Sequence, residues 1–522
     1  MDHMKEYLQS IYDQISELLS VQLSKQSTFT KTILIGTTAG AIAYSILKKR
    51  HRLPPGPLAL PIVGNLLFIF SQKEGWAKSF LRLSKKYGPV FTIYQGPFPV
   101  IVLNDIKSIN EALIQRSTDY SNRWIRHSFK LINSNGKGLV FSNPDEEWKA
   151  RKKTTAKALS FIFLLRNYIG SSNFETHIGE AVTEAIQVML QQTKPFDPDP
   201  FILFITINVL ASMCFGTRYD YNDDNYKLLL KIMEDLGEVL GEGICLEDFI
   251  SPLRLYPSKR FHKLQDISRR ALDYVTRNIQ EHRCLYNKDR ITDLTYGLLK
   301  AEEDSREGTV VLNEEQIRSS LIDLVLAGND TSRQTLYWAI FYLAAYPDIQ
   351  NKIYQEVRRV VDKTRMPKIT DREKLPYTYA FLHEVMRLGT AITVGVPHLT
   401  AVDTKIGEYD VPKNTTVFIN HWGLHHDPDQ WEDVETFKPE RFLDHTGNMA
   451  PKPENWLPFS TGRRLCIGKT LAMPELHLII ASLVQRLEIR AEPGRPVNFE
   501  AKEGPMEYAS HPYKIIVIDR NP

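Results

Sequence analysis

Residues 459–468 read FSTGRRLCIG and place Cys466, one of only four cysteines in the chain, between two glycines. The other three, Cys214, Cys245 and Cys284, lie far upstream, and no CxxC pair occurs, so the ligand spacing of a zinc site is absent. Sparse, unpaired thiols are typical of a chain whose bulk stays in a reducing compartment. We therefore expect Cys466 to be a reactive thiolate or to form a single bond to a metal.

The size and charge of the chain limit its function. Its 522 residues are 43% hydrophobic, which is enough to bury one large core or two adjoining ones. The net charge is only +3, from 65 basic and 62 acidic side chains, so we expect no nucleic-acid partner, because such proteins usually carry a strongly basic face. The chain also lacks a GxGxxG motif and a P-loop for a nucleotide of its own.

An apolar segment near the N-terminus predicts a membrane anchor. Residues 32–47, TILIGTTAGAIAYSIL, carry no charge and are followed at once by KKRHR at 48–52. A helix of this length reaches about 24 Å, so spanning a hydrocarbon core of about 30 Å needs Phe29 to Thr30 or a locally thinner bilayer. The alternatives are a buried helix and a cleaved signal peptide, although a signal peptide carries its basic residues before the apolar run. The basic cluster predicts a single pass through the endoplasmic reticulum membrane, with the catalytic domain cytosolic.

Prolines separate this segment from the rest of the chain. LPPGP at 53–57 and PIVGN at 61–65 cannot be helical, because proline fixes φ and biases the preceding residue to extended forms. We divide the chain into a luminal tail with anchor and basic stop (1–52), a proline-rich hinge (53–65) and one globular domain (66–522). Most of the domain is helical by pattern, including a helix opened by Asn143 and Pro144 and a long one from Asn313 to about Ala345. Three short segments predict strands, at 90–94, 100–103 and 512–518, so the fold class is mainly α with minor β.

The long helix contains a polar interruption, AGNDTS at 327–332, between apolar runs. Gly328 costs about 1 kcal/mol relative to alanine in a helix interior, and Asp330 is expensive to bury without a partner. One interpretation is an exposed polar patch on one helix face. The other is a helix that opens locally around a ligand, with the Thr331 hydroxyl and the Asp330 carboxyl handling protons.

Two further charged motifs do not indicate a function when each is taken alone. Glu384 and Arg387 share a helix face and, taken alone, would be an ordinary surface ion pair. Arg441 lies in PERF at 439–442, in a loop punctuated by prolines. Together with the hinge, residues 327–331 and the pattern F-x-x-G-x-R-x-C-x-G, these motifs stand in a characteristic order. From residue 53 onward the chain resembles the cytochrome P-450 family of haem-thiolate monooxygenases.

The resemblance implies the cytochrome P-450 fold with a haem b cofactor, and it assigns a role to each matching residue. Cys466 would be the axial ligand of the haem iron. Four residues match positions that meet the haem propionates: Trp148, Lys152, His398 and Arg464. Lys152 stands where arginine is usual, and it keeps the charge but loses the bidentate fork. Three residues match a structural triad that supports the haem side: Glu384, Arg387 and Arg441.

The resemblance also implies chemistry that needs electrons and protons. A thiolate ligand favours cleavage of the O–O bond of dioxygen, and Asp330 and Thr331 match the proton-delivery pair of the family. The electron donor would be the membrane-bound NADPH–cytochrome P-450 reductase, with cytochrome b5 as a second candidate. Because the docking surface of the reductase is acidic, we expect it to meet a basic helix with the residues Lys149, Arg151, Lys152, Lys153 and Lys157. The alternative for this helix is a solvated face without a partner.

The substrate is less well defined. DFISPL at 248–253 and HHDP at 425–428 are similar to the microsomal branch that contains steroid 17-hydroxylases and aromatic-hydrocarbon hydroxylases. The expected pocket walls are the stretch after Arg123, the helix around Leu326 and residues 391–396. They are largely apolar and suit a lipophilic substrate that enters from the bilayer, which leaves steroids, fatty acids and xenobiotics open. Two other functions remain open, a haem-thiolate isomerase or dehydratase that works without a reductase, and a non-catalytic haem- or lipid-binding membrane protein.

Overall fold

The computed structural model describes residues 52–60, 63–66, 75–125, 127–132, 137–168, 173–241, 246–248, 254–305, 312–362, 365–495, 497–499, 501–503 and 508–520. The membrane anchor predicted over 32–47 lies outside these residues. Among the helices of the described part, none combines the length and the apolar character that crossing a bilayer requires.

Helices make up most of the described chain and strands a small part, which confirms the mainly α class with minor β. The α-helices are α4 (Gly75–Tyr87), α5 (Ile106–Asn110), α6 (His127–Ile132), α7 (Glu146–Tyr168), α8 (Asn173–Leu190), α9 (Asp199–Phe215), α10 (Asp224–Gly241), α11 (Lys259–Cys284), α12 (Leu294–Ser305), α13 (Glu314–Ala345), α14 (Pro347–Val360), α15 (Pro376–Leu388), α16 (His421–His425) and α17 (Lys469–Arg486). Shorter helical turns are η2 (Glu111–Gln115), η4 (Leu246–Asp248), η6 (Ile369–Lys374), η7 (Pro439–Phe442) and η8 (Gly462–Arg464).

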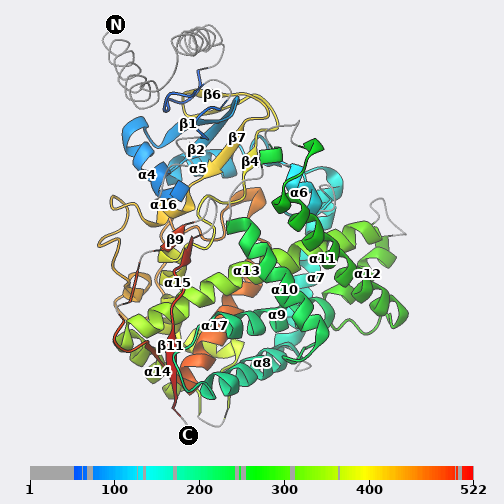
Figure 1. Ribbon diagram of the computed structural model, residues 1–522, viewed down its shortest axis with the longest axis vertical. Helices are drawn as coiled ribbons and strands as arrows, with labels where there is room; N and C mark the ends of the chain where they lie inside the picture. The colour runs from blue at the N-terminus through cyan, green and yellow to red at the C-terminus, as the bar shows by residue number, and fades with distance from the viewer. Residues whose placement is uncertain are drawn as a thin grey trace.

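The strands gather mainly at one end of the molecule (Figure 1). They are β1 (Val90–Gln95), β2 (Phe98–Leu103), β3 (Asn122–Arg123), β4 (His398–Leu399), β5 (Thr404–Ile406), β6 (Tyr409–Val411), β7 (Thr416–Ile419), β8 (Leu487–Ala491), β9 (Ala501–Glu503), β10 (Tyr508–Ser510) and β11 (Ile515–Asp519). The main sheet has the order β1-β2-β7-β4-β3, with β2 parallel to β7 and the other neighbours antiparallel. The strands predicted at 90–94 and 100–103 are therefore confirmed as a hairpin, and the prediction at 512–518 corresponds to β11.

The described part of the proline-rich segment lies against this sheet. The N–H of Thr92 donates to the carbonyl oxygen of Pro55 at 2.8 Å, and the N–H of Asn65 donates to that of Tyr94 at 2.7 Å. Segments around Pro55 and Asn65 thus run beside β1 and use backbone groups that the edge strand would otherwise leave unpaired.

Helix α13 crosses the middle of the molecule, between the main sheet and helices α9 and α17 (Figure 1). It begins where the sequence predicts, because the Asn313 side chain accepts from the N–H of Gln316 and the Gln316 side chain accepts from the N–H of Asn313. Both flanks of its polar interruption are buried, with Trp338 only 1% exposed, and a buried side chain of this kind contributes about 3 kcal/mol or more to stability. The position of α13 fixes the position of its polar stretch.

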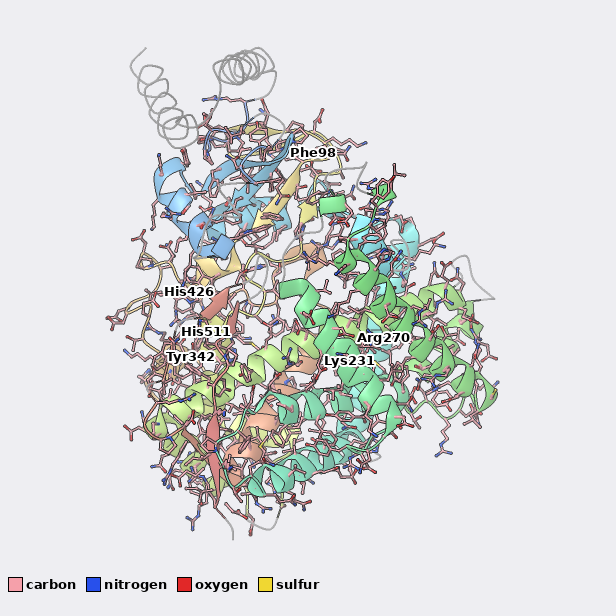
Figure 2. All side chains as sticks on the ribbon, viewed as in Figure 1. Phe98, Lys231, Arg270, Tyr342, His426 and His511 are labelled. Carbon is pink, nitrogen blue, oxygen red and sulfur yellow. The ribbon has the colours of Figure 1, made fainter. Side chains whose placement is uncertain are left out.

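Helices α10 and α11 pack on α13 and are tied to each other by charge. Lys231 and Arg270, both labelled in Figure 2, reach the carboxylate of Asp235 at 3.1 and 2.6 Å. Asp235 is 6% exposed, and its paired cations hold the pKa of its carboxyl below the usual value against the opposing effect of burial. This cluster makes α10 and α11 a joined pair of helices over α13.

Helix α7 differs from its prediction in two details. It begins at Glu146, and its cap is Asp145, whose Oδ1 accepts from the N–H of Trp148 at 2.7 Å, whereas Asn143 accepts from the N–H of Arg123 at 3.0 Å. Arg151, predicted on a basic docking face, is only 5% exposed and donates to the carbonyl oxygen of Gly138 at 3.3 Å. The prediction for Arg151 was wrong, because its helix position faces the protein interior.

Candidate active site

A cavity of about 330 Å³ lies beside the middle of α13. Its walls come from α7, α9, α13, the segment between α15 and β4, the end of β7, and the loop that carries Cys466. The segment 391–396 lines it as expected, through Ala391, Ile392, Gly395 and Val396. Much of the remaining wall is apolar, from Leu210, Met213, Leu324 and Ala327.

Cys466 borders this cavity from the loop between η8 and α17. The turn before it requires glycine, because Gly462 has a φ of 70° and a Cβ there would lie 1.9 Å from the carbonyl oxygen of Leu113. Burial raises the pKa of the Cys466 thiol, although the side chain is accessible from the cavity, while the N–H groups of Gly468 and Lys469 donate to the sulfur and lower this pKa. A metal ion in the cavity would replace the proton and bind the thiolate.

Three cations lie at one end of the cavity, Arg123, Lys152 and Arg464. Nη1 of Arg123 donates to the carbonyl oxygen of Val396 at 2.6 Å, and Nε of Arg464 donates to that of Ser121 at 2.8 Å. Burial lowers the pKa of all three, that of Arg464 to about 10. Within the described residues these cations form no ion pair with a carboxylate, and a buried charge without a partner is costly. This end of the cavity therefore favours an anionic ligand.

Trp148 and His398 complete the same end. The guanidinium carbon of Arg464 lies 4.1 Å from the ring centroid of Trp148, whose Nε1 donates to the carbonyl oxygen of Leu139 at 2.9 Å. Nδ1 of His398 is 2.7 Å from the carbonyl oxygen of Tyr120, and burial holds the pKa of this histidine well below its usual value. All four residues predicted to meet the propionates thus line one end of one cavity.

Helix α13 brings Thr331 to the cavity but not Asp330. The Thr331 hydroxyl donates to the carbonyl oxygen of Ala327 at 2.9 Å, and its lone pairs are free for a ligand or water. The Asp330 carboxylate instead accepts from Nε2 of Gln334 at 2.9 Å and lies 3.6 Å from Nη1 of Arg333. Burial raises the pKa of Asp330, and Arg333 opposes this. The helix is unbroken from 314 to 345, so the expected local opening is not seen.

The residues of the predicted triad meet in the interior. Nε and Nη2 of Arg387 donate to Oε2 and Oε1 of Glu384, both at 2.8 Å, and Nε of Arg441 donates to Oε1 at 3.3 Å. Glu384 and Arg387 are fully buried, so the alternative of a surface ion pair was wrong.

The triad is connected to the loop that carries Cys466. The N–H of Leu457 donates to Nε2 of His425 at 3.0 Å, which leaves the proton of the neutral ring on Nδ1. Nδ1 is 2.9 Å from the hydroxyl of Thr390, and that hydroxyl donates to the carbonyl oxygen of Arg387 at 2.7 Å. Glu384 and Arg387 therefore help to position the segment that leads to the cysteine.

Sequence reasoning missed the roles of Arg123 and Asp323. The sequence predicted a pocket wall in the stretch after Arg123 and gave Arg123 itself no role. Its guanidinium lies among the cations of the cavity. Oδ2 of Asp323 accepts from the N–H groups of Leu139 and Val140 at 2.5 and 2.9 Å, and burial raises the pKa of its carboxyl to about 6. The one sequence feature that could have identified Asp323 is its position as an acid in an apolar stretch of helix. No sequence motif around Arg123 indicates that it lines the cavity.

The chemistry of the wall indicates which group fits. In the described part of the chain no cluster of three or more His, Cys, Asp or Glu side chains could hold a bare metal ion. A metal that brings its own ligands fits beside Cys466, and the cations at one end favour a group that carries acids. Haem meets both conditions, since its ring holds the iron and its two propionates are carboxylates.

Comparisons with known proteins agree with this geometry. The model of the family described as Cytochrome P450 matches residues 54–518. The chain is 36% identical to cytochrome P450 1A1 of Opsanus tau over 489 residues, which cover 90% of this chain and 93% of the relative. It is 36% identical to cytochrome P450 1A1 of Oryzias latipes and 34% identical to cytochrome P450 1A3 of Oncorhynchus mykiss, each with the same coverage. The chain belongs to the cytochrome P450 family, whose members bind haem with a cysteine thiolate as the axial ligand of the iron.

Proposed function

We propose that this protein is a membrane-bound monooxygenase that inserts one oxygen atom of dioxygen into a lipophilic substrate. NADPH supplies the electrons through a partner reductase. One observation carries the proposal: Cys466, a set of uncompensated cations and an apolar wall with Thr331 all border a single cavity.

In this proposal Cys466 is the iron ligand, and Lys152, His398 and Arg464, joined by Arg123, hold the propionates, with Trp148 packed on Arg464. Haem bound there supplies an iron whose thiolate ligand donates electron density toward dioxygen. The N–H groups that point at the sulfur limit this donation and stabilise the anionic ligand.

Thr331 and Asp330 have different tasks. Thr331 holds a water or a ligand oxygen at the cavity through its lone pairs, while its O–H donates a hydrogen bond to the Ala327 carbonyl oxygen. Asp330 lies one residue earlier, outside the cavity wall, beside Arg333 and Gln334. We assign it to the supply of protons from the far side of α13 to the water next to Thr331.

The reductase, or cytochrome b5, would dock on the exposed side of α7. Lys149, Lys153 and Lys157 are exposed there, and Arg463 is exposed on the adjacent turn before the cysteine. Arg151 is buried and does not take part. Exposed cations attract an acidic partner over a distance and set the rate of encounter rather than much of the affinity.

The substrate is a xenobiotic or steroid-like molecule, and the aromatic-hydrocarbon branch is favoured. The relatives named cytochrome P450 1A1 and the HHDP match at 425–428 support this assignment. The apolar stretch at 32–47 supports anchoring in the endoplasmic reticulum membrane, from which a lipophilic substrate can enter.

The carbon-monoxide complex of the reduced protein tests the site. If Cys466 binds the iron, the parent shows the red-shifted Soret band of thiolate ligation, and Cys466→Ala loses that band and most of the haem. An unchanged spectrum in the variant overturns the assignment. Consumption of NADPH with added reductase and a panel of lipophiles then separates the monooxygenase from an isomerase or dehydratase, which needs no electrons, and from a non-catalytic binder.

A further inference from the structure

His421 is a buried polar residue of the cavity that the proposed mechanism does not use. It is the first residue of α16, separated from the end of β7 by Asn420, and is 5% exposed. Among the described residues, its Nε2 has no hydrogen-bond partner. Burial lowers the pKa of the ring to about 4, so at neutral pH the imidazole carries one N–H donor and one acceptor. Buried polar atoms are rarely left unpaired and each needs an explanation, and His421 lines the cavity.

The sheet places this ring close to the cationic end of the cavity. His398 of β4 pairs with Val417 of β7, so continuing the antiparallel register brings residue 395 opposite 420 and residue 394 opposite 421. The ring packs on Gly395, where a Cβ would lie 2.8 Å from Cε1 of His421. The next residue, Val396, accepts from the guanidinium of Arg123 at 2.6 Å. One short stretch of chain thus seats His421, binds Arg123 and carries His398.

His421 also neighbours the loop that leads to the cysteine. Its charge would lower the pKa values of both His398 and His425, which places the ring near each of them. His425 accepts from the N–H of Leu457, just before the segment that carries Cys466. His421 lines the same cavity as Cys466 and the three cations, so a group that bonds to Cys466 and reaches the cations shares this cavity with the ring.

The charges of the wall identify the kind of group that meets the ring. The acidic side chains among the described residues that line the cavity are Asp323 and Glu475, against Arg123, Lys152 and Arg464. Asp323 is already engaged by two backbone N–H groups. The cations therefore favour a ligand that carries carboxylates. A carboxylate oxygen is also a strong hydrogen-bond acceptor for a neutral imidazole N–H.

We infer that His421 donates a hydrogen bond from its imidazole to a carboxylate of the haem, beside the charges supplied by Arg123, Lys152 and Arg464. This inference rests on the proposed haem site. His421 is a positioning residue in this role: it adds a neutral donor where a further buried cation would be repelled by the three already present.

The test measures haem retention by the full-length holoprotein, as the rate of haem transfer to excess apomyoglobin. We compare His421→Leu, which removes the donor at similar volume, with His421→Gln, which keeps an N–H. The matched control is His477→Leu, because His477 is also buried with an unpartnered Nε2 but lies outside the cavity wall. Binding of phenylimidazole to the iron and the urea midpoint of each variant are measured in parallel.

A lost hydrogen bond to a charged acceptor corresponds to about tenfold faster haem transfer for His421→Leu. His421→Gln and His477→Leu should lose haem near the parent rate, and the affinity for phenylimidazole should not change. Transfer at the parent rate in His421→Leu overturns the inference, whether or not phenylimidazole binding changes. Equal acceleration in the Leu and Gln variants, with lowered urea midpoints, also overturns it, since the ring would then only fill space. Failure of the proposed function looks different, because Cys466→Ala would then keep the thiolate spectrum of the parent.

Discussion

Replacing Arg387 by methionine should destabilise the protein far more than loss of a surface charge. Arg387 is fully buried, donates to Glu384 twice at 2.8 Å, and donates to the carbonyl oxygen of His425 at 2.9 Å. Arg387→Met leaves the Glu384 carboxylate in the interior with Arg441 as its remaining cation, at 3.3 Å. Breaking a buried pair from one side costs about 3–5 kcal/mol, and we expect the lower half of this range because Arg441 stays.

The expected loss translates into a measurable shift. Unfolding entropy of about 2.1 cal/mol/K per residue over about 460 residues gives about 1 kcal/mol/K, so Tm should fall by about 3–4 °C. The assay is thermal unfolding of the holoprotein, followed by circular dichroism and by the haem absorbance. Because the chain from Arg387 through Thr390 and His425 reaches the segment before Cys466, the haem signal should be lost at least as early as helicity.

Two controls decide whether the charge is the cause. Glu146→Gln removes an exposed pair with Lys149, 2.6 Å apart, and should cost less than about 1 kcal/mol. Adding Glu384→Gln to Arg387→Met removes the unpaired carboxylate and should recover part of the loss. The reasoning is refuted if Arg387→Met shifts Tm no more than Glu146→Gln, or if the double variant is no more stable than Arg387→Met alone.

Three further predictions concern protons, electrons and pH. Thr331→Ala should keep the haem spectrum but raise the share of NADPH flux that ends as hydrogen peroxide by about tenfold, whereas Thr331→Ser should stay near the parent. Reversing the charges of Lys149 and Lys153 should slow reductase-driven turnover, more at low salt than at high salt, while turnover with added peroxide is unchanged. Burial raises the pKa of Asp323 to about 6, so between about pH 4 and pH 6 the folded protein keeps a proton that the unfolded chain releases. Its stability should therefore fall by up to about 3 kcal/mol as pH rises through this window, and urea midpoints of Asp323→Asn should lack that slope.

Each of these predictions has an outcome that contradicts it. Equal coupling in the parent and in Thr331→Ala removes the hydroxyl from the proton supply. Equal losses with reductase and with peroxide mean that Lys149 and Lys153 belong to a folding element rather than a docking surface. Parallel pH curves for the parent and Asp323→Asn mean that Asp323 titrates at its ordinary pKa.

The sequence was sufficient to predict the elements that are stabilised by interactions between residues close together in the chain. The cap at Asn313 and the length of α13 follow from hydrogen bonds between residues three apart and from a continuous apolar pattern. The hairpin of β1 and β2 follows from two short β-branched runs. The turn at Gly462 depends on a positive φ that glycine adopts without strain, so the cysteine motif could be recognised from letters alone.

The sequence by itself determined the mainly α class, the cysteine loop and several of the side chains that line one cavity, because their spacing and type are local properties of the chain. Only the tertiary structure decided which way the other side chains point. Arg151 and Lys152 are neighbours on α7, yet one is buried against Gly138 and the other lines the cavity. Asp330 and Thr331 are consecutive, yet a helix turns each residue by about 100°, so of these two only Thr331 lines the cavity. His421 meets Gly395 and its cationic neighbours because β7 pairs with β4, and such pairing is set by the register of whole strands, which no single short motif encodes.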